Sequence, residues 1–127
     1  MWQKLAGLAI AGACGSLCRY GLAGLAQRFL GSAFPWGTLA VNLLGCLLFG
    51  LAWSLMEGRL SPSPEVRVVL LVGFLGAFTT FSTFVFESDR LLDEAQWLLA
   101  ALNVVGSLAL GLVAYRLGTL LGRMLPW

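Results

Sequence analysis

The polar residues that carry chemical information in this sequence lie inside long apolar runs. Arg19, Asn42 and Asn103 each interrupt such a run, and Thr79 stands beside Thr80 in another. The chain has no histidine, so it lacks the commonest general base and the commonest metal ligand of proteins. Amides and hydroxyls offer neutral hydrogen bonds, and these residue types therefore indicate ion binding or helix contact instead of bond making.

Arg19 is the charged residue that stands deepest in the first apolar run. A buried arginine is costly unless it is paired, hydrated or able to reach the membrane surface. One interpretation places Arg19 near a helix end, with its guanidinium at the interface. The other places it beside a water-filled vestibule, where its positive potential attracts anions.

Two amides share helical faces with hydroxyl residues. Thr38 and Asn42 are four residues apart, as are Asn103 and Ser107, so each pair lies on one side of a helix. An amide can donate two hydrogen bonds to an anion, and it can equally join two helices inside a membrane. The sequence leaves both roles open for Asn42 and for Asn103.

The third apolar run has the densest group of small and polar residues, from Gly73 to Phe84. Threonine is β-branched and diverts backbone hydrogen bonds, so Thr79 and Thr80 beside glycine indicate a break in the helix. Carbonyls freed by such a break can bind a cation. Phe81 lies three residues before Phe84, and a positive ring edge can meet an anion, although such pairs ordinarily only pack.

The elements that carry these residues must cross a membrane. Of 127 residues, 59% are hydrophobic and 11% are charged, and the mean hydropathy is +0.88. A soluble domain has about 25% charged residues. No charge occurs between Arg28 and Glu57, and two similar gaps follow, each close to the ~20 residues of a spanning helix. We predict an all-α integral membrane protein with one domain, residues 1–127, whose four spans are approximately 4–27, 35–56, 67–88 and 95–116.

The basic residues define the orientation of these spans only weakly. Lys4 and four arginines lie on one predicted side, whereas Arg28 and Arg90 lie on the other. Because lysine and arginine excess sets membrane orientation, a weak bias indicates a chain that can insert both ways. Four helices are also too few to enclose a polar pathway comfortably. Both observations favour a homodimer.

Three other functional classes fit the sequence less well. A proton-coupled drug exporter needs a titratable acid within the membrane, and a membrane enzyme needs a nucleophile with a base. A purely structural assembly subunit does not need polar residues on three spans. The acids all lie at predicted span ends or in loops: Glu57, Glu65, Glu87, Asp89, Asp93 and Glu94.

Three motifs resemble those of the small bacterial fluoride channels, the Fluc or CrcB family of fluoride exporters. The first resembles the Gly-x-x-x-Arg-Tyr of that family, the second its Gly-Thr-Leu-x-x-Asn-x-x-Gly, and the third its Gly-Phe-x-Gly-x-x-Thr-Thr-Phe-Ser-Thr-Phe. In this chain they are the segments 15–20, 37–45 and 73–84. Some relatives carry tyrosine where this chain has Asn103, so the resemblance does not assign a role to Asn103.

The resemblance implies a fold and a function. The fold is an antiparallel, dual-topology homodimer in the cell (inner) membrane, with the third helix broken mid-membrane. The function is a channel, not an enzyme, that exports fluoride passively from the cytoplasm down its electrochemical gradient and protects against fluoride toxicity. The dimer has two pores and a structural sodium ion, and no nucleic acid partner is expected.

The resemblance also assigns residues. The backbone carbonyls of Gly76 and Thr79 hold the sodium ion, and Arg19 lies near a vestibule. The residues expected along the fluoride path are Phe81, Phe84, Asn42, Thr38, Ser82, Thr83 and Ser107.

Overall fold

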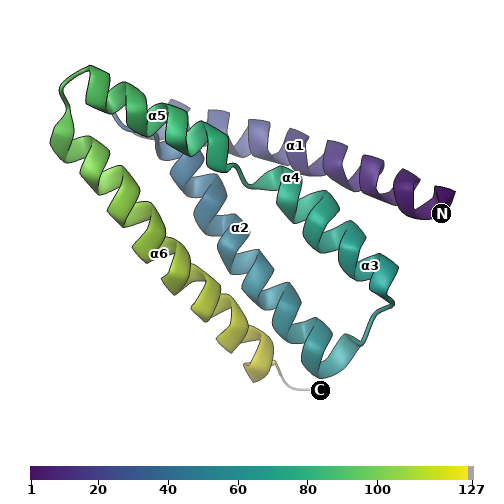
Figure 1. Cartoon of the computed structure of the whole chain (residues 1–127). Helices are drawn as coiled ribbons and strands as arrows, with labels where there is room; N and C mark the ends of the chain where they lie inside the picture. Colours follow the sequence, from purple (N-terminus) through teal and green to yellow (C-terminus); the bar gives the residue numbers. More distant parts are fainter. Residues whose placement is uncertain (126–127) are drawn as a thin grey trace.

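The computed structural model describes residues 1–125, and within that range the regular elements are all helical (Figure 1). In chain order they are α1 (Trp2–Leu30), α2 (Trp36–Leu55), the π-helical η1 (Met56–Leu60), α3 (Pro64–Val68), the π-helical η2 (Val69–Leu75), α4 (Gly76–Phe78), α5 (Phe81–Asp93) and α6 (Trp97–Met124).

Across the described residues, four helical segments are long and apolar enough to cross a membrane. They are Trp2–Leu30, Trp36–Gly58, Pro64–Asp93 and Trp97–Met124. The prediction of an all-α chain with four spanning helices is therefore confirmed. The fourth helix extends beyond the predicted end at 116, because it continues through Arg116 to Met124. An arginine can extend its charged head to water from within a helix, so a charge does not by itself end one.

The most extensive helix contact joins α2 to α6, and the two helices run side by side (Figure 1). Glycines on both helices bring the backbones together. A Cβ atom on Gly118 would overlap the carbonyl oxygen of Leu47, and one on Gly50 would overlap that of Tyr115. Small residues allow this approach in membrane proteins, where packing replaces the hydrophobic effect as the force between helices.

The first helix packs mainly on the part of the third span that precedes Thr79. It contacts η2 most extensively and also contacts α2 and α4, and Gly15 is its buried residue. A Cβ atom on Gly15 would overlap the carbonyl oxygen of Phe74. α1 therefore packs both on α2 and on the half of the third span that precedes the two adjacent threonines.

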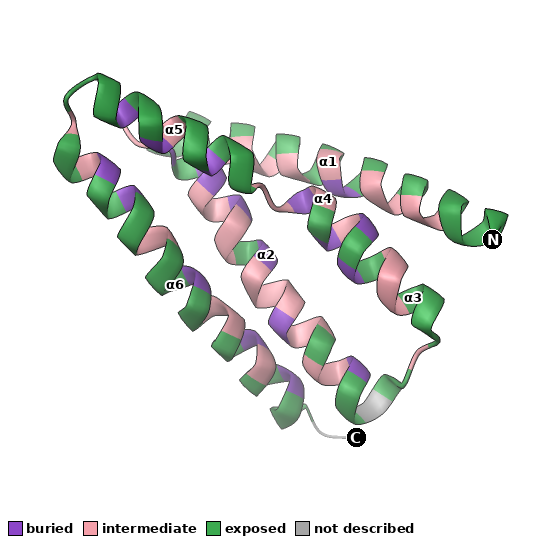
Figure 2. Cartoon of the chain, in the orientation of Figure 1, coloured by how far each residue is buried: buried purple, intermediate pink, exposed green. Residues whose placement is uncertain are grey.

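Much of the apolar surface of the chain is exposed (Figure 2). Leu17 on α1 is 71% exposed and Leu112 on α6 is 69% exposed. The main buried cluster is small and consists of Met56, Leu71 and Leu75. An apolar surface of this extent needs lipid or another protein surface to cover it.

A tight corner joins α5 to α6. The backbone N–H of Ala95 donates to the carbonyl of Leu92 at 2.9 Å, and that of Gln96 donates to the carbonyl of Leu91 at 2.8 Å. This is the bonding pattern of a Schellman motif. Ala95 occupies the left-handed position of the motif, with φ of 56°.

Within the third span, α4 ends at Phe78 and α5 begins at Phe81. The two residues between them are extended: Thr79 has φ −82° and ψ 159°, and Thr80 has φ −146° and ψ 121°. Backbone groups at this junction therefore lack their regular helical partners and must find others.

Candidate functional site

The side chain of Asn42 forms two hydrogen bonds with the extended backbone at the junction between α4 and α5. Its Nδ2 donates to the carbonyl of Thr80, and its Oδ1 accepts the N–H of Thr80, both at 2.9 Å. The side-chain amide thus satisfies the backbone N–H and C=O of Thr80, as the peptide group of a neighbouring turn or strand would otherwise do. Asn42 is the residue that joins α2 to the junction, and one N–H of its amide remains available for another partner.

Thr79 is held by its own helix and by a glycine on α2. Its backbone N–H and its Oγ1 both donate to the carbonyl of Leu75, at 3.1 and 3.0 Å. A Cβ atom on Gly45 would overlap Cγ2 of Thr79. The absence of a side chain at Gly45 therefore makes room for the threonine methyl group.

Thr80 begins the next helix. Its Oγ1 accepts the backbone N–H of Thr83 at 3.3 Å and donates to Oγ1 of Thr83 at 3.0 Å. A threonine that accepts the N–H of the third helical residue is a regular N-cap. The backbone of Thr80 is bound to α2 and its side chain caps α5, so this residue orients the second half of the span.

Two carbonyls at the junction have lost their regular helical donors to other acceptors. In an uninterrupted helix the N–H of Thr80 would donate to the carbonyl of Gly76, but that N–H is bound to Asn42. The carbonyl of Thr79 instead faces a cation, because Nη1 of Arg19 donates to it at 3.5 Å. Oxygen atoms of this kind are suitable ligands for a hard monovalent cation.

A cavity of about 340 Å³ lies beside this junction. Five of the residues predicted for ion binding line it, from three helical spans, and among the described lining residues no side chain carries a formal charge. The lining residues are Asn42, Gly45, Cys46, Phe49, Thr79, Thr80, Phe81, Phe84, Ser107, Leu108 and Tyr115.

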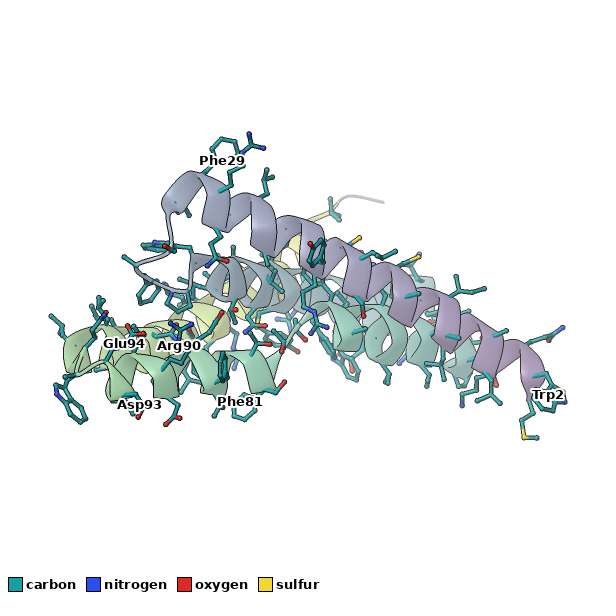
Figure 3. All side chains as sticks on the ribbon, turned by 90° about the horizontal axis from the view of Figure 1, so that it is seen from above. Trp2, Phe29, Phe81, Arg90, Asp93 and Glu94 are labelled. Carbon is teal, nitrogen blue, oxygen red and sulfur yellow. The ribbon has the colours of Figure 1, made fainter. Side chains whose placement is uncertain are left out.

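The two phenylalanines at the start of α5 lie together on the cavity. Their ring centroids are 5.8 Å apart, and the rings are tilted by 42°. Phe84 is buried, whereas Phe81 is 74% exposed and projects from the outer side of α5 (Figure 3). The cavity therefore has one sheltered aromatic wall and one aromatic residue at its open edge.

Other predicted residues lie near the cavity without lining it. Ser82 and Thr83 are exposed on the first turn of α5, and Arg19 is half-buried on α1. Gly76 is part of α4, one turn before the junction. Thr38 is buried on α2, one turn before Asn42.

Thr38 lies beside Glu87, an acid that was predicted at a span end and given no role. Glu87 is half-buried on α5, and its Oε2 is buried without a hydrogen-bond partner. It lines a second cavity of about 150 Å³, together with Arg90 and Glu94, which form a salt bridge of 3.0 Å (Figure 3). The spacing of Thr38 and Asn42, which puts both on one face of α2, was the available signal for Glu87, because a carboxylate that packs on that face lies beside the Thr38 hydroxyl.

Asn103 is buried between α5 and α6 and is 1% exposed. Its Nδ2 donates to Oγ of Ser88 at 2.9 Å, and its Oδ1 accepts from Oγ of Ser107 at 3.3 Å. Of the two roles left open for Asn103, the structure shows the helix–helix contact. Through Ser107 this contact reaches the lining of the larger cavity.

Four other residues that line the larger cavity were not predicted from the sequence, namely Cys46, Phe49, Leu108 and Tyr115. Cys46 and Phe49 follow Asn42 at four and seven residues, the spacing of one helical face. That spacing was the available signal for both. Tyr115 lies on α6, and its position depends on how α6 packs against α2.

Comparison with known proteins gives a consistent result over nearly the whole chain. The family model described as CrcB-like protein, Camphor Resistance (CrcB), matches residues 6–119. A protein of Nitrosococcus oceani named fluoride-specific ion channel FluC is 53% identical over 125 residues, which is 98% of this chain and 100% of that protein.

Two further relatives have the same name. The protein of Nitratidesulfovibrio vulgaris strain Miyazaki F is 57% identical over 122 residues, 96% of this chain and 98% of the relative. The protein of Solidesulfovibrio magneticus is 50% identical over 125 residues, 98% of this chain and 100% of the relative.

Proposed function

The chain belongs to the CrcB-like family, which is a family of channels and not of enzymes, and we propose that it is a fluoride-selective channel. It exports fluoride passively from the cytoplasm, down the electrochemical gradient, and so protects the cell against fluoride toxicity. The relatives named fluoride-specific ion channel match it from end to end and support this assignment.

The observation that carries the proposal is the uncharged cavity beside the junction of α4 and α5. Fluoride is small and strongly hydrated, so a selective path must replace its water with short-range donors. Asn42 and Ser107 supply such donors. The edges of Phe81 and Phe84 add weak positive potential. None of these groups carries a charge that would trap the anion, and passage requires binding that is not too tight.

The remaining predicted polar residues extend this path in our proposal. Thr38 lies one turn from Asn42, and Ser82 and Thr83 lie on the same helical turn as Phe81. Arg19 is the positive charge nearest to the junction through its contact with Thr79. Its role in the proposal is to raise the local concentration of anions at the entrance of the path.

A structural sodium ion is part of the proposal, and the carbonyls of Gly76 and Thr79 would hold it. The chemistry of these oxygens fits the ion, because one has lost its helical donor and the other accepts from a guanidinium cation. A bound cation here supplies fixed positive charge that offsets the repulsion between anions inside the protein.

The proposed assembly is an antiparallel, dual-topology homodimer with two pores in the cell (inner) membrane. In it, the junction of α4 and α5 lies mid-membrane and interrupts the third span. The large exposed apolar surface of α1 and the weak orientation signal of the loops support the assembly. An interruption at that depth is tolerated only where protein or water covers it, and a second copy supplies that cover.

Fluoride efflux from liposomes that contain the purified protein tests the proposal, with chloride efflux measured in parallel. Wild type is compared with Phe81→Ile and Phe84→Ile, which keep apolar bulk and remove the ring edges. Phe29→Ile is the matched control, because Phe29 is 77% exposed on α1 and does not line the cavity. We expect rapid fluoride release with little chloride release, lowered at least about tenfold by the two pore variants only.

Absence of fluoride release from folded wild-type protein would overturn the assignment. An equal loss in Phe29→Ile would remove the support that the cavity gives, because the effect would then not depend on the pore rings.

Proton-coupled transport is the alternative that one observation favours, namely the half-buried Glu87 with its unpartnered oxygen. Fluoride efflux measured with Glu87→Gln in the same liposomes distinguishes a passive channel from a proton-coupled carrier. A passive channel releases fluoride without a proton gradient in wild type and in the variant. A coupled carrier releases fluoride only as protons move, and it loses this coupling when Glu87 is replaced.

A further inference from the structure

A continuous series of hydrogen bonds, part-buried at Ser107 and buried beyond it, leads from the larger cavity into the α5–α6 interface. It starts at Ser107, which lines the cavity, and passes through Asn103 to Ser88. It ends where Oγ of Ser88 donates to the carbonyl of Phe84 at 2.8 Å. Phe84 also lines the cavity, so the series of bonds begins and ends at residues of the cavity lining.

All three donations run in one direction. Ser107 gives its hydroxyl proton to Oδ1 of Asn103, Nδ2 of Asn103 donates to Ser88, and Ser88 gives its own proton to the carbonyl of Phe84. A serine hydroxyl has a single proton. Ser107 therefore directs only lone pairs toward the cavity while this bond is made, and lone pairs repel an anion.

The weakest bond of the chain is the one next to the cavity. The distance from Ser107 to Asn103 is 3.3 Å, against 2.9 Å from Asn103 to Ser88 and 2.8 Å from Ser88 to Phe84. Hydroxyl donors are normally about 2.7–2.8 Å from an oxygen acceptor. The inner bonds thus fix the amide of Asn103, and the outer bond is the one that breaks most easily.

We propose that Asn103 is a positioning residue that holds the proton of Ser107 away from the cavity. Ser107 donates to a passing fluoride ion only while its bond to Asn103 is broken, and the buried amide recaptures the proton when the ion leaves. Ser107 is thereby a releasable donor and not a permanent one. The inference rests on the proposed function, because it takes the anion in the cavity to be fluoride.

The test measures the initial fluoride efflux rate from liposomes over a range of fluoride concentrations, for wild type, Asn103→Leu, Ser107→Ala and the double variant. Leucine approximates the shape of asparagine and has no acceptor. In Asn103→Leu the proton of Ser107 is free to point into the cavity, so the half-saturating fluoride concentration falls about tenfold. In the Ser107→Ala background, Asn103→Leu leaves that concentration unchanged.

A purely structural role of Asn103 would lower the maximum rate and leave the half-saturating concentration as it is. That result overturns the inference, as does a shift that persists in the Ser107→Ala background. Thr119→Val is the matched control on α6, because the hydroxyl of Thr119 donates to the carbonyl of Arg116 within its own helix. It is expected to change neither quantity.

Asn103→Ala replaces Asn103→Leu if leucine prevents folding, with the same expected shift. Absence of fluoride efflux from wild type overturns the proposed function, and this inference with it. Wild-type efflux with an unchanged half-saturating concentration in the Asn103 variant overturns this inference alone.

Discussion

α2 contacts two other segments in two different ways. Against α6 it packs backbone to backbone, because the positions of Gly118 and Gly50 leave no room for a Cβ atom beside the facing carbonyls. Against the junction of α4 and α5 it is joined by side chains, through the amide of Asn42 on Thr80 and the methyl of Thr79 over Gly45. The first contact can change only if whole helices move, whereas the second can change one group at a time.

The largest effect is expected where backbones touch. In Gly118→Ala the new methyl group meets backbone atoms of Leu47 and Leu51, which cannot rotate away. We expect a loss of about 3 kcal/mol of stability, measured as a lower thermal unfolding midpoint in detergent. Gly106→Ala on the same helix is the control, because a Cβ atom there meets nothing within 4 Å. Equal midpoints for the two variants would contradict the distinction between the contacts.

The amide of Asn42 is expected to have the next largest effect, on transport. In Asn42→Asp one carboxylate oxygen still accepts the N–H of Thr80, but the other faces the carbonyl of Thr80, acceptor against acceptor. The variant also adds a negative charge to the cavity wall. Fluoride efflux should fall at least about hundredfold. Efflux within threefold of wild type would show that the amide does not organise the path.

A rescue experiment tests whether the second contact is made by side chains. In Gly45→Ala the new methyl overlaps Cγ2 of Thr79, which should lower stability by about 1–2 kcal/mol. Thr79→Ser removes that methyl and keeps both the hydroxyl bonded to Leu75 and the backbone carbonyl. The double variant should recover most of the unfolding midpoint. No recovery would mean that Gly45, like Gly118, is limited by the backbone.

The smallest effect is expected at the cap of α5. Thr80→Val keeps the shape of the side chain but removes the acceptor for the N–H of Thr83, at a cost of about 1 kcal/mol. Thr80→Ser retains the acceptor and should unfold at nearly the wild-type midpoint. If valine and serine behave alike, the bond between Asn42 and the backbone alone orients α5.

The sequence predicts features that depend on composition along the chain. Charge-free gaps located the last three spans, because lipid excludes charge wherever it falls in the sequence, and the long apolar run around Arg19 indicated the first. Asn42 and Thr79 could be selected as candidate site residues because they are polar groups within apolar runs. These signals are local, and each can be recognised without knowing what the residue touches.

The partners of these residues were not predictable in the same way. Asn42 binds the backbone of Thr80, which is 38 residues away, and Thr38 lies beside Glu87. Both pairs depend on how α2 is rotated against α5, and that rotation follows from the packing of glycines and side chains over the whole length of the helix. The π-helical turns of η2 were not foreseen either, because no residue type specifies a wide turn.

The corner between α5 and α6 offers a means of engineering the protein for structural work. Ala95 has a left-handed backbone, in which the Cβ atom of any L-residue other than glycine crowds the following carbonyl. Glycine at this corner removes a strain of about 1 kcal/mol, although it adds freedom to the unfolded chain. Ala95 does not line the larger cavity. The backbone of this corner can therefore be altered without changing the residues on which conduction is proposed to depend.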